Sequence, residues 1–578
     1  MRKVISVIAM LLGAAALVVG IGQKTFWAPP ETVTATMPQL DGEAPLTVIE
    51  SSVNDPKLDP VELVIKAKGE FTASLGRSYD VDAWVDNAAH VSLTGVDTEN
   101  HQMIAEYVDG EAEVPNPAGD DIFFDSQSAD GTMTYRWTTP DSGDWSLLLA
   151  AGGKDAAPVD ISVTYANDDA MPFALPLIIA GSVLLVFGLA LLVMRPSKPK
   201  NSAHTQHSVA AVAVVAMAIS GVALPMQPQD DSSATPSESA SPSEEASSSA
   251  SSSAPAEESG SATATESASE SSADADAEPT AYPVLTEEQL KNVLADVQKQ
   301  VGNADDKQDV KALESRAAGA FKYLRGQRYD MLKKDYKVDK PLTLNTQVLR
   351  SAAVPNASDA EFPRVISVVT AKDNDADTLP QALTLVQKSA RDNFQVVFAG
   401  QMLPNSSFPG IAVGDPATQQ LTADAKDLQM TPEKALEALA DVLTNENSKQ
   451  KDAFADSDFI KAIHAAQKSE SDDADEAKVS YKRSVTKGDT YAVSTPDGGA
   501  IVVGKLNNKA LFERTENADP LKSSDKLTEQ LLGSSSSNGN VESTYAEPVM
   551  FYIPADGSED KIQLISADQV LLTVKEVD

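Results

Sequence analysis

Residues 172–224 read PFALPLIIAGSVLLVFGLALLVMRPSKPKNSAHTQHSVAAVAVVAMAISGVAL, two apolar segments separated by a short polar loop. An α-helix needs about 20 apolar residues to cross a bilayer; the segment at 173–194 reaches this length, and the segment at 208–224 approaches it. The loop at 195–207 carries lysines and an arginine but no acidic residue, which is typical of the cytoplasmic side of a membrane. We therefore predict transmembrane helices at 172–194 and 208–226, joined by a cytoplasmic loop.

The chain begins with a further apolar stretch. Two basic residues precede an apolar run at 4–22, and Phe26 and Trp27 follow it, as aromatic residues do at a membrane interface. We predict an uncleaved signal anchor at 1–24, with a cleaved signal peptide as the alternative. The basic N-terminus then stays in the cytoplasm and residues 25–171 face outward. The chain is thus expected to be a multi-pass membrane protein with three spans and extracytoplasmic large domains.

The length, net charge and cysteine content of the chain narrow the classes of function that it could have. A chain of 578 residues allows three or four compact units. Its net charge of −39 disfavours nucleic acid and anionic surfaces as general partners. It contains no cysteine, which excludes disulfides, thiol catalysis, zinc held by cysteine and lipid-modified cysteine.

Residues 25–171 show the pattern of an all-β domain. Short runs rich in β-branched and aromatic residues alternate with turn signals such as the Pro-Asp-Ser-Gly segment at 140–143. Strands of this length and spacing favour a sandwich. The predicted strands are Val61–Ala67, Tyr79–Val85, Thr132–Thr138, Trp145–Leu149 and Val159–Tyr165.

Three tryptophans and a group of acids lie within these runs. We expect the tryptophans to fill the core, with sugar stacking as the alternative. They are Trp84, Trp137 and Trp145. In an extended strand Asp80, Asp82 and Asp86 share one face. We expect that face to be exposed to solvent, with weak calcium binding as the alternative.

Residues 227–281 form a low-complexity segment of Ser, Ala and Glu. Between Pro228 and Thr280 there are twelve acids and no lysine or arginine. Such a composition buries too little apolar surface to offset chain entropy, so we expect a disordered spacer. An acidic interaction segment is the alternative.

The C-terminal region, 282–578, combines helical and strand patterns twice. A capping box at Thr286–Gln289 starts the first helical pattern, a second helix is expected over 306–335, and strand-like runs follow. After a connecting segment at 405–429 the order restarts. We predict two α+β halves, 282–404 and 430–578, similar to NTF2-like (cystatin-like) folds. A mobile insertion is expected at 532–543.

Few residues carry a motif for chemistry. The five histidines, at positions 90, 101, 204, 207 and 464, show no HExxH or paired spacing, and there is no G-x-S-x-G or Walker motif. Asp373, Asp375 and Asp377 form a D-x-D pattern, a weak metal candidate. The plainer interpretation is a solvated hairpin turn, since the residues that would complete a calcium loop are missing. We predict no catalytic residue and no cofactor.

Two short stretches, together with the order of the domains, resemble a known protein family. Ile219-Ser220-Gly221-Val222 resembles the end of a lipoprotein signal, with Val222 in place of the lipidated cysteine, and the β-domain contains Tyr79–Val85. With this order of domains, the chain resembles a family of actinobacterial membrane proteins known from corynebacteria and mycobacteria. Its members are often labelled glycosyltransferase and include a factor needed for lipomannan elongation and lipoarabinomannan maturation. The resemblance implies a role in lipoglycan assembly and transfers no catalytic residue.

Three functions follow as hypotheses. The first is a non-catalytic envelope-assembly factor in the cytoplasmic membrane, whose partner is a lipid-linked glycan, a lipoglycan precursor or a membrane-bound glycosyltransferase. The second is a glycosyltransferase that uses the acids at 373–377. The third is a structural or sensing protein of the envelope.

Overall fold

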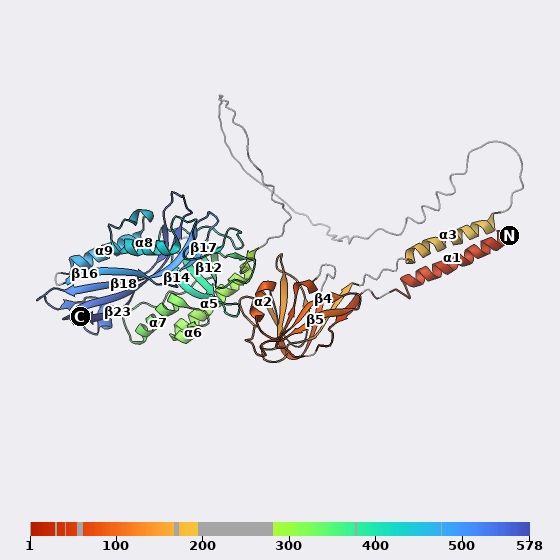
Figure 1. Cartoon of the computed structure of the whole chain (residues 1–578), viewed down its shortest axis with the longest axis horizontal. Coiled ribbons are helices and arrows are strands. Elements are labelled where there is room, and N and C mark those ends of the chain that lie inside the picture. The colour runs from red at the N-terminus through yellow and green to blue at the C-terminus, as the bar shows by residue number, and fades with distance from the viewer. Residues whose placement is uncertain are drawn as a thin grey trace, which may run out of the picture. The chain divides into compact units, whose positions relative to one another are not determined.

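The computed structural model describes residues 2–28, 30, 32–40, 42–54, 62–166, 173–194, 281–375, 378–474 and 477–578 (Figure 1). Two compact units are present. The first is helical and falls within Met1–Ala28 and Asp169–Ala275, and the second comprises Pro29–Asp168 and Asp276–Asp578. The predicted cytoplasmic loop at 195–207, the third span at 208–226 and nearly all of the acidic spacer lie outside the described residues.

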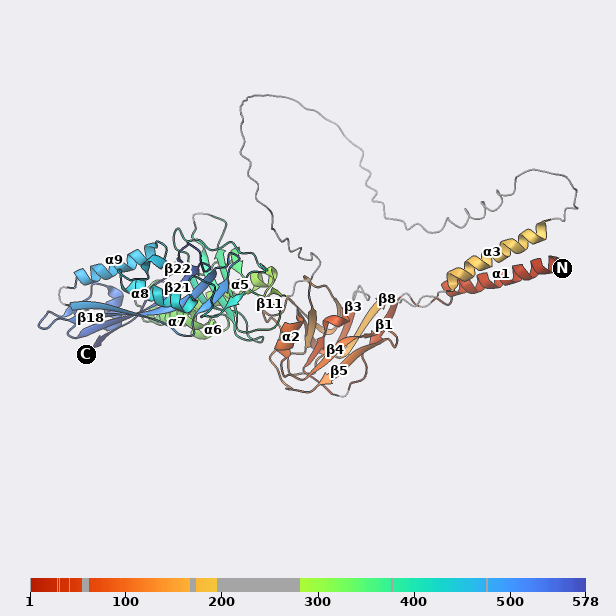
Figure 2. The ribbon, with the colours of Figure 1, turned by 45° about the horizontal axis from the view of Figure 1, so that its top comes forward.

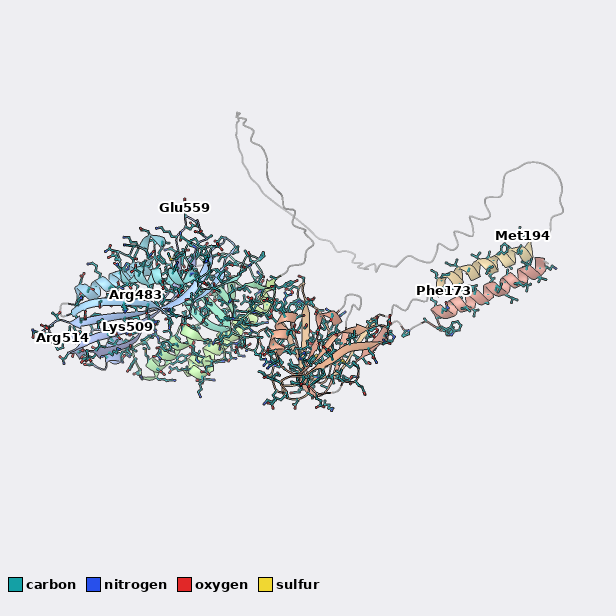
Figure 3. All side chains as sticks on the ribbon, viewed as in Figure 1. Phe173, Met194, Arg483, Lys509, Arg514 and Glu559 are labelled. Carbon is teal, nitrogen blue, oxygen red and sulfur yellow. The ribbon has the colours of Figure 1, made fainter. Side chains whose placement is uncertain are left out.

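The helical unit pairs the two apolar helices predicted at the N-terminus and before residue 195. They are α1 (Arg2–Lys24) and α3 (Ala174–Val193), both long and apolar enough to cross a membrane. Figure 3 marks Phe173 and Met194 at the two ends of α3. The helices are antiparallel neighbours, because the start of one contacts the end of the other.

Small residues at every seventh position let these two helices approach closely. The Ser6 hydroxyl donates to the Gly188 carbonyl at 2.5 Å. Seven residues after Ser6, a Cβ added at Gly13 would lie 2.8 Å from the Gly181 carbonyl oxygen. Seven residues later again, Gly20 packs against the first turn of α3. Packing by small residues and interhelical hydrogen bonds is how helices associate in lipid.

The predicted all-β domain is present as a closed barrel rather than the expected sandwich. The long strand β3 pairs with β8 along its first half and with β7 along its second half, which closes the ring β3-β7-β2-β4-β5-β1-β8, and β6 lies along the other edge of β3. The strands are β1 (Thr32–Thr36), β2 (Leu46–Ile49), β3 (Glu62–Arg77), β4 (His90–Asp97), β5 (Gln102–Val108), β6 (Asp125–Arg136), β7 (Trp145–Ala150) and β8 (Asp160–Ala166).

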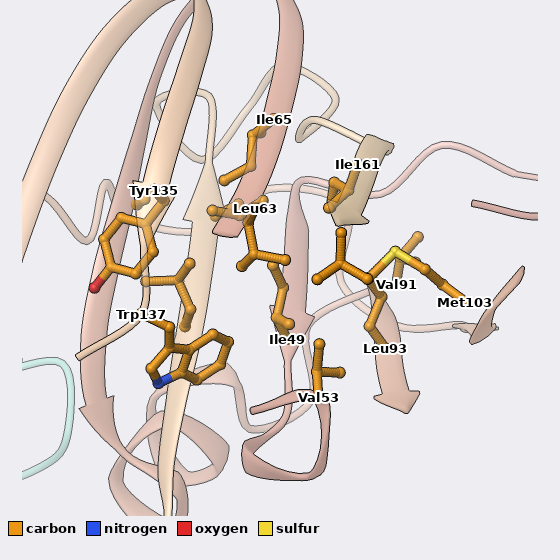
Figure 4. Close-up of a cluster of buried hydrophobic side chains, with 14 of the residues drawn as sticks. Ile49, Val53, Leu63, Ile65, Val91, Leu93, Met103, Tyr135, Trp137 and Ile161 are labelled. Carbon is orange, nitrogen blue, oxygen red and sulfur yellow. The ribbon is translucent and has the colours of Figure 1, made fainter. Parts of the chain in front are cut away.

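Inward-facing side chains fill the barrel. Ile49, Leu63 and Ile161 meet in its centre with Trp137 beside them (Figure 4). All three tryptophans predicted to be core residues are buried. Trp84 lies in a second cluster, outside the barrel core, with Val81 and Val85.

The prediction of a strand at 79–85 was wrong, because Ser78–Val85 forms the helix α2. A helix places residues 80, 81, 84 and 85 on one face, and these four are the buried ones. Asp80 is therefore buried at 2 % exposure instead of lying on a solvated strand face, while Asp82 and Asp86 are exposed as expected. An eight-residue segment contains too few periods for its pattern to separate a helix from a strand.

The first C-terminal half places helices before an antiparallel sheet. The helix expected over 306–335 is split, since Gln308 ends α5 in the left-handed conformation and Gly319, at φ +52°, starts the next long helix. The elements are α5 (Glu287–Lys307), α6 (Val310–Leu313), α7 (Gly319–Lys333), and the sheet of β10 (Val348–Ala353), β12 (Arg364–Ala371), β13 (Gln381–Gln387) and β14 (Gln395–Gln401) in that order. The short strands β9 (Tyr282–Pro283) and β11 (Asn356–Ala357) pair beside it.

The second half repeats this order around a long hairpin. β18 pairs with β21 along almost its whole length, β16 and β17 pair with the free edge of β18, and β22 and β23 pair with β21. The elements are α8 (Pro432–Thr444), α9 (Asp458–Asp472), β16 (Ala477–Val485), β17 (Tyr491–Ser494), β18 (Ala500–Arg514), β21 (Asn540–Ile553), β22 (Gln563–Ala567) and β23 (Val570–Val577).

The insertion expected at 532–543 has regular structure. Helix α10 (Lys526–Leu532) is followed by β20 (Ser536–Ser537), which pairs with β19 (Leu521–Lys522). Residues 540–543 belong to β21. The strand β15 (Gln420–Leu421), from the connecting segment, pairs with β17.

The two sheets pack face to face between the helices. Every residue of β12 is buried, because alternate side chains point to different clusters. Ile366 and Val368 pack under α5 with Leu290, whereas Val369 packs against Ile501 of the second half. The second sheet contacts α8 through its own core, so the layers run helix, sheet, sheet, helix (Figure 2).

Candidate functional site

The acids of the D-x-D pattern lie in the loop between β12 and β13. Asp373 and Asp375 are exposed, and Asp377 lies outside the described residues. The Asp373 carbonyl accepts a hydrogen bond from Arg350, and its carboxylate accepts one from the Asp375 backbone N–H. Both contacts are typical of an exposed turn, which agrees with the prediction of a solvated hairpin turn.

The described histidines form separate local contacts. His90 bonds to the Ala88 carbonyl, His101 to the Tyr165 hydroxyl, and His464 to the Val442 carbonyl at 2.7 Å. Within the ranges that the structure describes, no three His, Asp or Glu side chains gather in a way that suits a metal ion. The described residues therefore offer no ready-made metal centre.

A buried ion pair joins the barrel to the C-terminal region. Asp80 of α2 and Arg364 at the start of β12 form a two-pronged ion pair, with Arg364 Nη1 3.2 Å from Asp80 Oδ2. Both residues are 2 % exposed. Burial raises the pKa of the Asp80 carboxyl, and the Arg364 guanidinium acts in the opposite direction. Removing either partner would leave the other charge buried without a counter-charge, which strongly destabilises a folded protein.

A second buried arginine anchors the turn that follows residue 119 of the barrel. Arg316, between α6 and α7, donates to both carboxylate oxygens of Asp121 and through Nε to Asp296 at 2.8 Å. The Asp121 carboxylate also accepts the backbone N–H of Phe394 at 2.9 Å, and the Asp121 N–H donates to Asn393. The backbone N–H and the carboxylate of Asp121 thus both bond to residues of the C-terminal region.

A third arginine caps α2 from the other side. Arg391 donates to the carbonyls of Trp84 and Val85, at 2.7 and 2.8 Å, where α2 ends. Its guanidinium lies 5.2 Å from the centre of the Trp84 ring. A cation at a helix C-terminus satisfies free carbonyls and the helix dipole, so the C-terminal region completes a helix of the barrel domain.

A fourth arginine is held between two aromatic rings. The Arg77 guanidinium lies 4.4 Å from the Trp145 ring of the barrel and 3.9 Å from the Tyr282 ring of β9. It also donates to Asp141. Cation–π contacts of this kind are worth more when they are desolvated.

The indole of Trp84 touches a carboxyl with an altered pKa. Its N–H donates to Asp120 at 2.8 Å. Burial raises the pKa of Asp120 to about 6, and this hydrogen bond acts in the opposite direction. The stretch Tyr79–Val85, which carried the family resemblance, is one of the segments through which the barrel contacts the C-terminal region.

A cavity of about 680 Å³ opens between the two C-terminal halves. Residues from α7, the loop after it and the end of β14 form one wall, and residues 566–570 form the other. Phe321, Leu324 and Leu342 contribute apolar surface, while Arg328 and Lys340 contribute positive charge. The volume lies within the range of about 300–1,000 Å³ usual for small-molecule sites.

Neither this cavity nor the arginine contacts were predicted from the sequence. One signal for the cavity was present, because residues 322–340 contain seven basic and three acidic side chains in a chain of net charge −39. The partners that form the cavity lie more than 200 residues apart, at α7 and β22, so spacing alone does not connect them.

A family model described as a domain of unknown function, DUF8094, matches residues 281–575, more than half of the chain. The match covers both C-terminal halves and the cavity between them. No curated protein and no solved structure matches the chain.

Proposed function

The chain belongs to the DUF8094 family, a domain of unknown function, and from this premise we propose that it is a non-catalytic, membrane-anchored assembly factor of the cell envelope. Its proposed role is to support lipomannan and lipoarabinomannan maturation by binding a lipid-linked glycan or a membrane-bound glycosyltransferase. The observation that carries the proposal is the cavity between the C-terminal halves, which combines apolar and charged side chains, Arg328 and Lys340 among them.

The contacts of the barrel support the proposed topology. Asp80–Arg364 and Asp121–Arg316 join the barrel to the C-terminal region, so both must lie on the same side of the membrane. If α1 and α3 both cross, residue 195 is on the opposite side. The chain must then cross again before residue 281, and the apolar segment at 208–226 is suited to do so. Three spans, with the large domains outside, are therefore part of the proposal.

The order of elements supports a finer proposal about the fold. In each C-terminal half, helices precede a curled antiparallel sheet, as in an NTF2-like (cystatin-like) domain. An experimental structure of the C-terminal region that superposes on such domains would test this assignment.

A glycosyltransferase remains the alternative for one reason. Leu379, in the loop that carries Asp373 and Asp375, lines the cavity. A metal held by the loop acids would thus be close to a ligand in the cavity. Against this alternative, the two described acids are exposed and engaged in turn contacts.

The proposal is tested by deletion and complementation. We expect deletion to shorten lipoglycans on gels, and we expect a chain carrying Asp373→Ala, Asp375→Ala and Asp377→Ala to restore their length fully. A normally folded triple variant that fails to complement would favour the enzyme. Unchanged lipoglycans in the deletion strain would refute the assembly role.

A further inference from the structure

The cavity between the C-terminal halves is lined by three cations, two acids and several apolar side chains. Arg325, Arg328 and Lys340 all line it, in a chain of net charge −39. The three cations do not play the same role, and their hydrogen bonds separate them.

Arg325 is part of the wall. It donates to both carboxylate oxygens of Asp305 at 2.7 Å and to the Leu342 carbonyl at 2.6 Å. Tyr329 donates to the same Asp305 carboxylate. This buried network ties the loop at 339–342 to α7 and α5, so Arg325 positions the loop and has little capacity left for a ligand.

Arg328 and Lys340 retain donors for a ligand. Arg328 lies one turn further along α7, on the same face as Arg325 and Leu324, and donates one long bond of 3.3 Å to the Asp339 carbonyl. Neither Arg328 nor Lys340 forms an ion pair with any residue in the part of the chain that the structure describes. Asp339 and Asp568 also line the cavity, but among the described residues neither forms an ion pair with Arg328 or Lys340, so both cations keep donors that suit an anion.

Part of the apolar lining of the cavity is exposed. Leu342 is 38 % exposed and Leu379 is 40 % exposed, which makes them two of the few large apolar side chains exposed in the described part of this unit. Phe398 and Met402 lie beneath them. Exposed apolar surface next to a cavity is a common sign of a ligand site.

We propose that this cavity binds a lipid phosphate, with the phosphate at Arg328 and Lys340 and the first part of the hydrocarbon chain over Leu324, Leu342 and Leu379. A cavity of about 680 Å³ has room for one headgroup and a short length of a single hydrocarbon chain, and two cationic side chains match the two negative charges of a free phosphate monoester. This deepens the proposed function, on which it rests for the place of such a ligand in the envelope: the form recognised is the lipid carrier without its glycan, whose phosphate is a free monoester.

Binding is measured by calorimetry on the full-length chain in phosphatidylcholine nanodiscs. Farnesyl monophosphate is the probe, farnesol is the same chain without charge, and phosphatidylglycerol supplies the diester of a membrane lipid. We expect farnesyl monophosphate to bind, and farnesol and phosphatidylglycerol to bind at least tenfold more weakly. Equal binding of farnesol, or equal binding of phosphatidylglycerol, overturns the proposal, the latter in favour of a membrane-surface contact.

The variant series locates the site. Arg328→Gln with Lys340→Gln removes both charges, and we expect affinity for farnesyl monophosphate to fall by roughly 100-fold or more, since two charged hydrogen bonds are lost. Lys333→Gln with Lys334→Gln removes two charges from the end of α7 outside the cavity and should leave affinity unchanged. Equal losses in both pairs would show general charge attraction and refute the site.

A second variant guards against a failure to fold. Leu379→Glu places a negative charge on the exposed rim, where little packing is lost, and should weaken binding while the thermal unfolding midpoint stays the same. Unaltered binding contradicts the proposal. These results are independent of the deletion phenotype, so tight, variant-sensitive binding together with unchanged lipoglycans would refute the assembly role and leave the lipid phosphate site standing.

Discussion

Asp80 shows that the surroundings of a side chain in the folded protein decide whether it is exposed or buried. In sequence it is one of three alternating acids, and in the structure it is the one of the three that is buried and paired with an arginine from 284 positions further along the chain. Removing two charges from water costs several kcal/mol per ion, which the mutual attraction recovers only with good geometry. The pair therefore contributes mainly to the specificity with which the barrel meets the C-terminal region.

Removing Arg364 tests this contact. Arg364→Ala leaves the Asp80 carboxylate buried without its partner, and we expect a loss of about 3–5 kcal/mol in the stability of the docked state. Amide hydrogen exchange of residues 78–85 in the full-length chain is the measurement, because α2 should lose protection first.

Two matched variants accompany it. Arg350→Ala removes an exposed arginine from the neighbouring strand β10 and should leave exchange in α2 unaltered. The double variant Asp80→Leu with Arg364→Met removes both charges and should recover most of the protection, because apolar replacements of a buried pair are often neutral. If amide exchange of α2 in the Arg364→Ala variant equals that in the native chain, the Asp80–Arg364 pair does not stabilise the contact between the barrel and the C-terminal region.

At the scale of elements, α2 and the helix pair α1–α3 depend on partners from distant sequence. α2 has only eight residues, too few to be stable alone in water, and its last carbonyls are bonded by Arg391. α1 and α3 are stable as helices in lipid, but their association rests on contacts between small residues.

A single large residue should separate that pair. Gly181→Leu places a Cβ 2.8 Å from the Gly13 carbonyl oxygen and the Leu17 nitrogen, and backbone atoms cannot move aside as a flexible side chain would. We expect overpacking to cost about 1–3 kcal/mol, seen as a lower thermal aggregation midpoint of the detergent-solubilised chain. Val183→Leu, at an exposed position of α3, is the control. A midpoint equal to that of the control would show that the glycine contact is not required.

For the whole molecule, the docking of the barrel on the C-terminal region links the fold to membrane topology. Four arginines, at positions 77, 316, 364 and 391, make contacts across it. Two domains that share buried charges fold in the same compartment. The number of membrane crossings between them must therefore be even.

Labelling of single cysteines tests the topology directly, because the native chain has no cysteine. We expect a membrane-impermeant maleimide to label Asp373→Cys and Ser252→Cys in intact cells. Asn201→Cys should react only after permeabilisation. Labelling of Asn201→Cys from outside would contradict the three-span arrangement, and failure to label Asp373→Cys would place the C-terminal region in the cytoplasm.

Much of the local structure could be predicted from periodicity. The capping box at Thr286 forms as expected, with both of its reciprocal hydrogen bonds. The strand predicted at Trp145–Leu149 is present as β7 and ends one residue later, and the apolar helices at the two ends of the barrel sequence are present. In each case the signal comes from residues a few positions apart, which is the distance over which secondary structure is set.

The candidate site could not be predicted in the same way. Whether Ser78–Val85 is a helix or a strand depends on what covers it, and its covering residues, Arg364 and Arg391, are almost 300 positions away. The cavity likewise needs two halves to meet. The local hydrophobic period and the capping residues of the sequence predict the apolar helices, the longer amphipathic helices and part of the strands. Which arginine reaches which carboxylate is settled by the packing of whole domains, because a buried charge is tolerated only where the folded chain brings its partner to it.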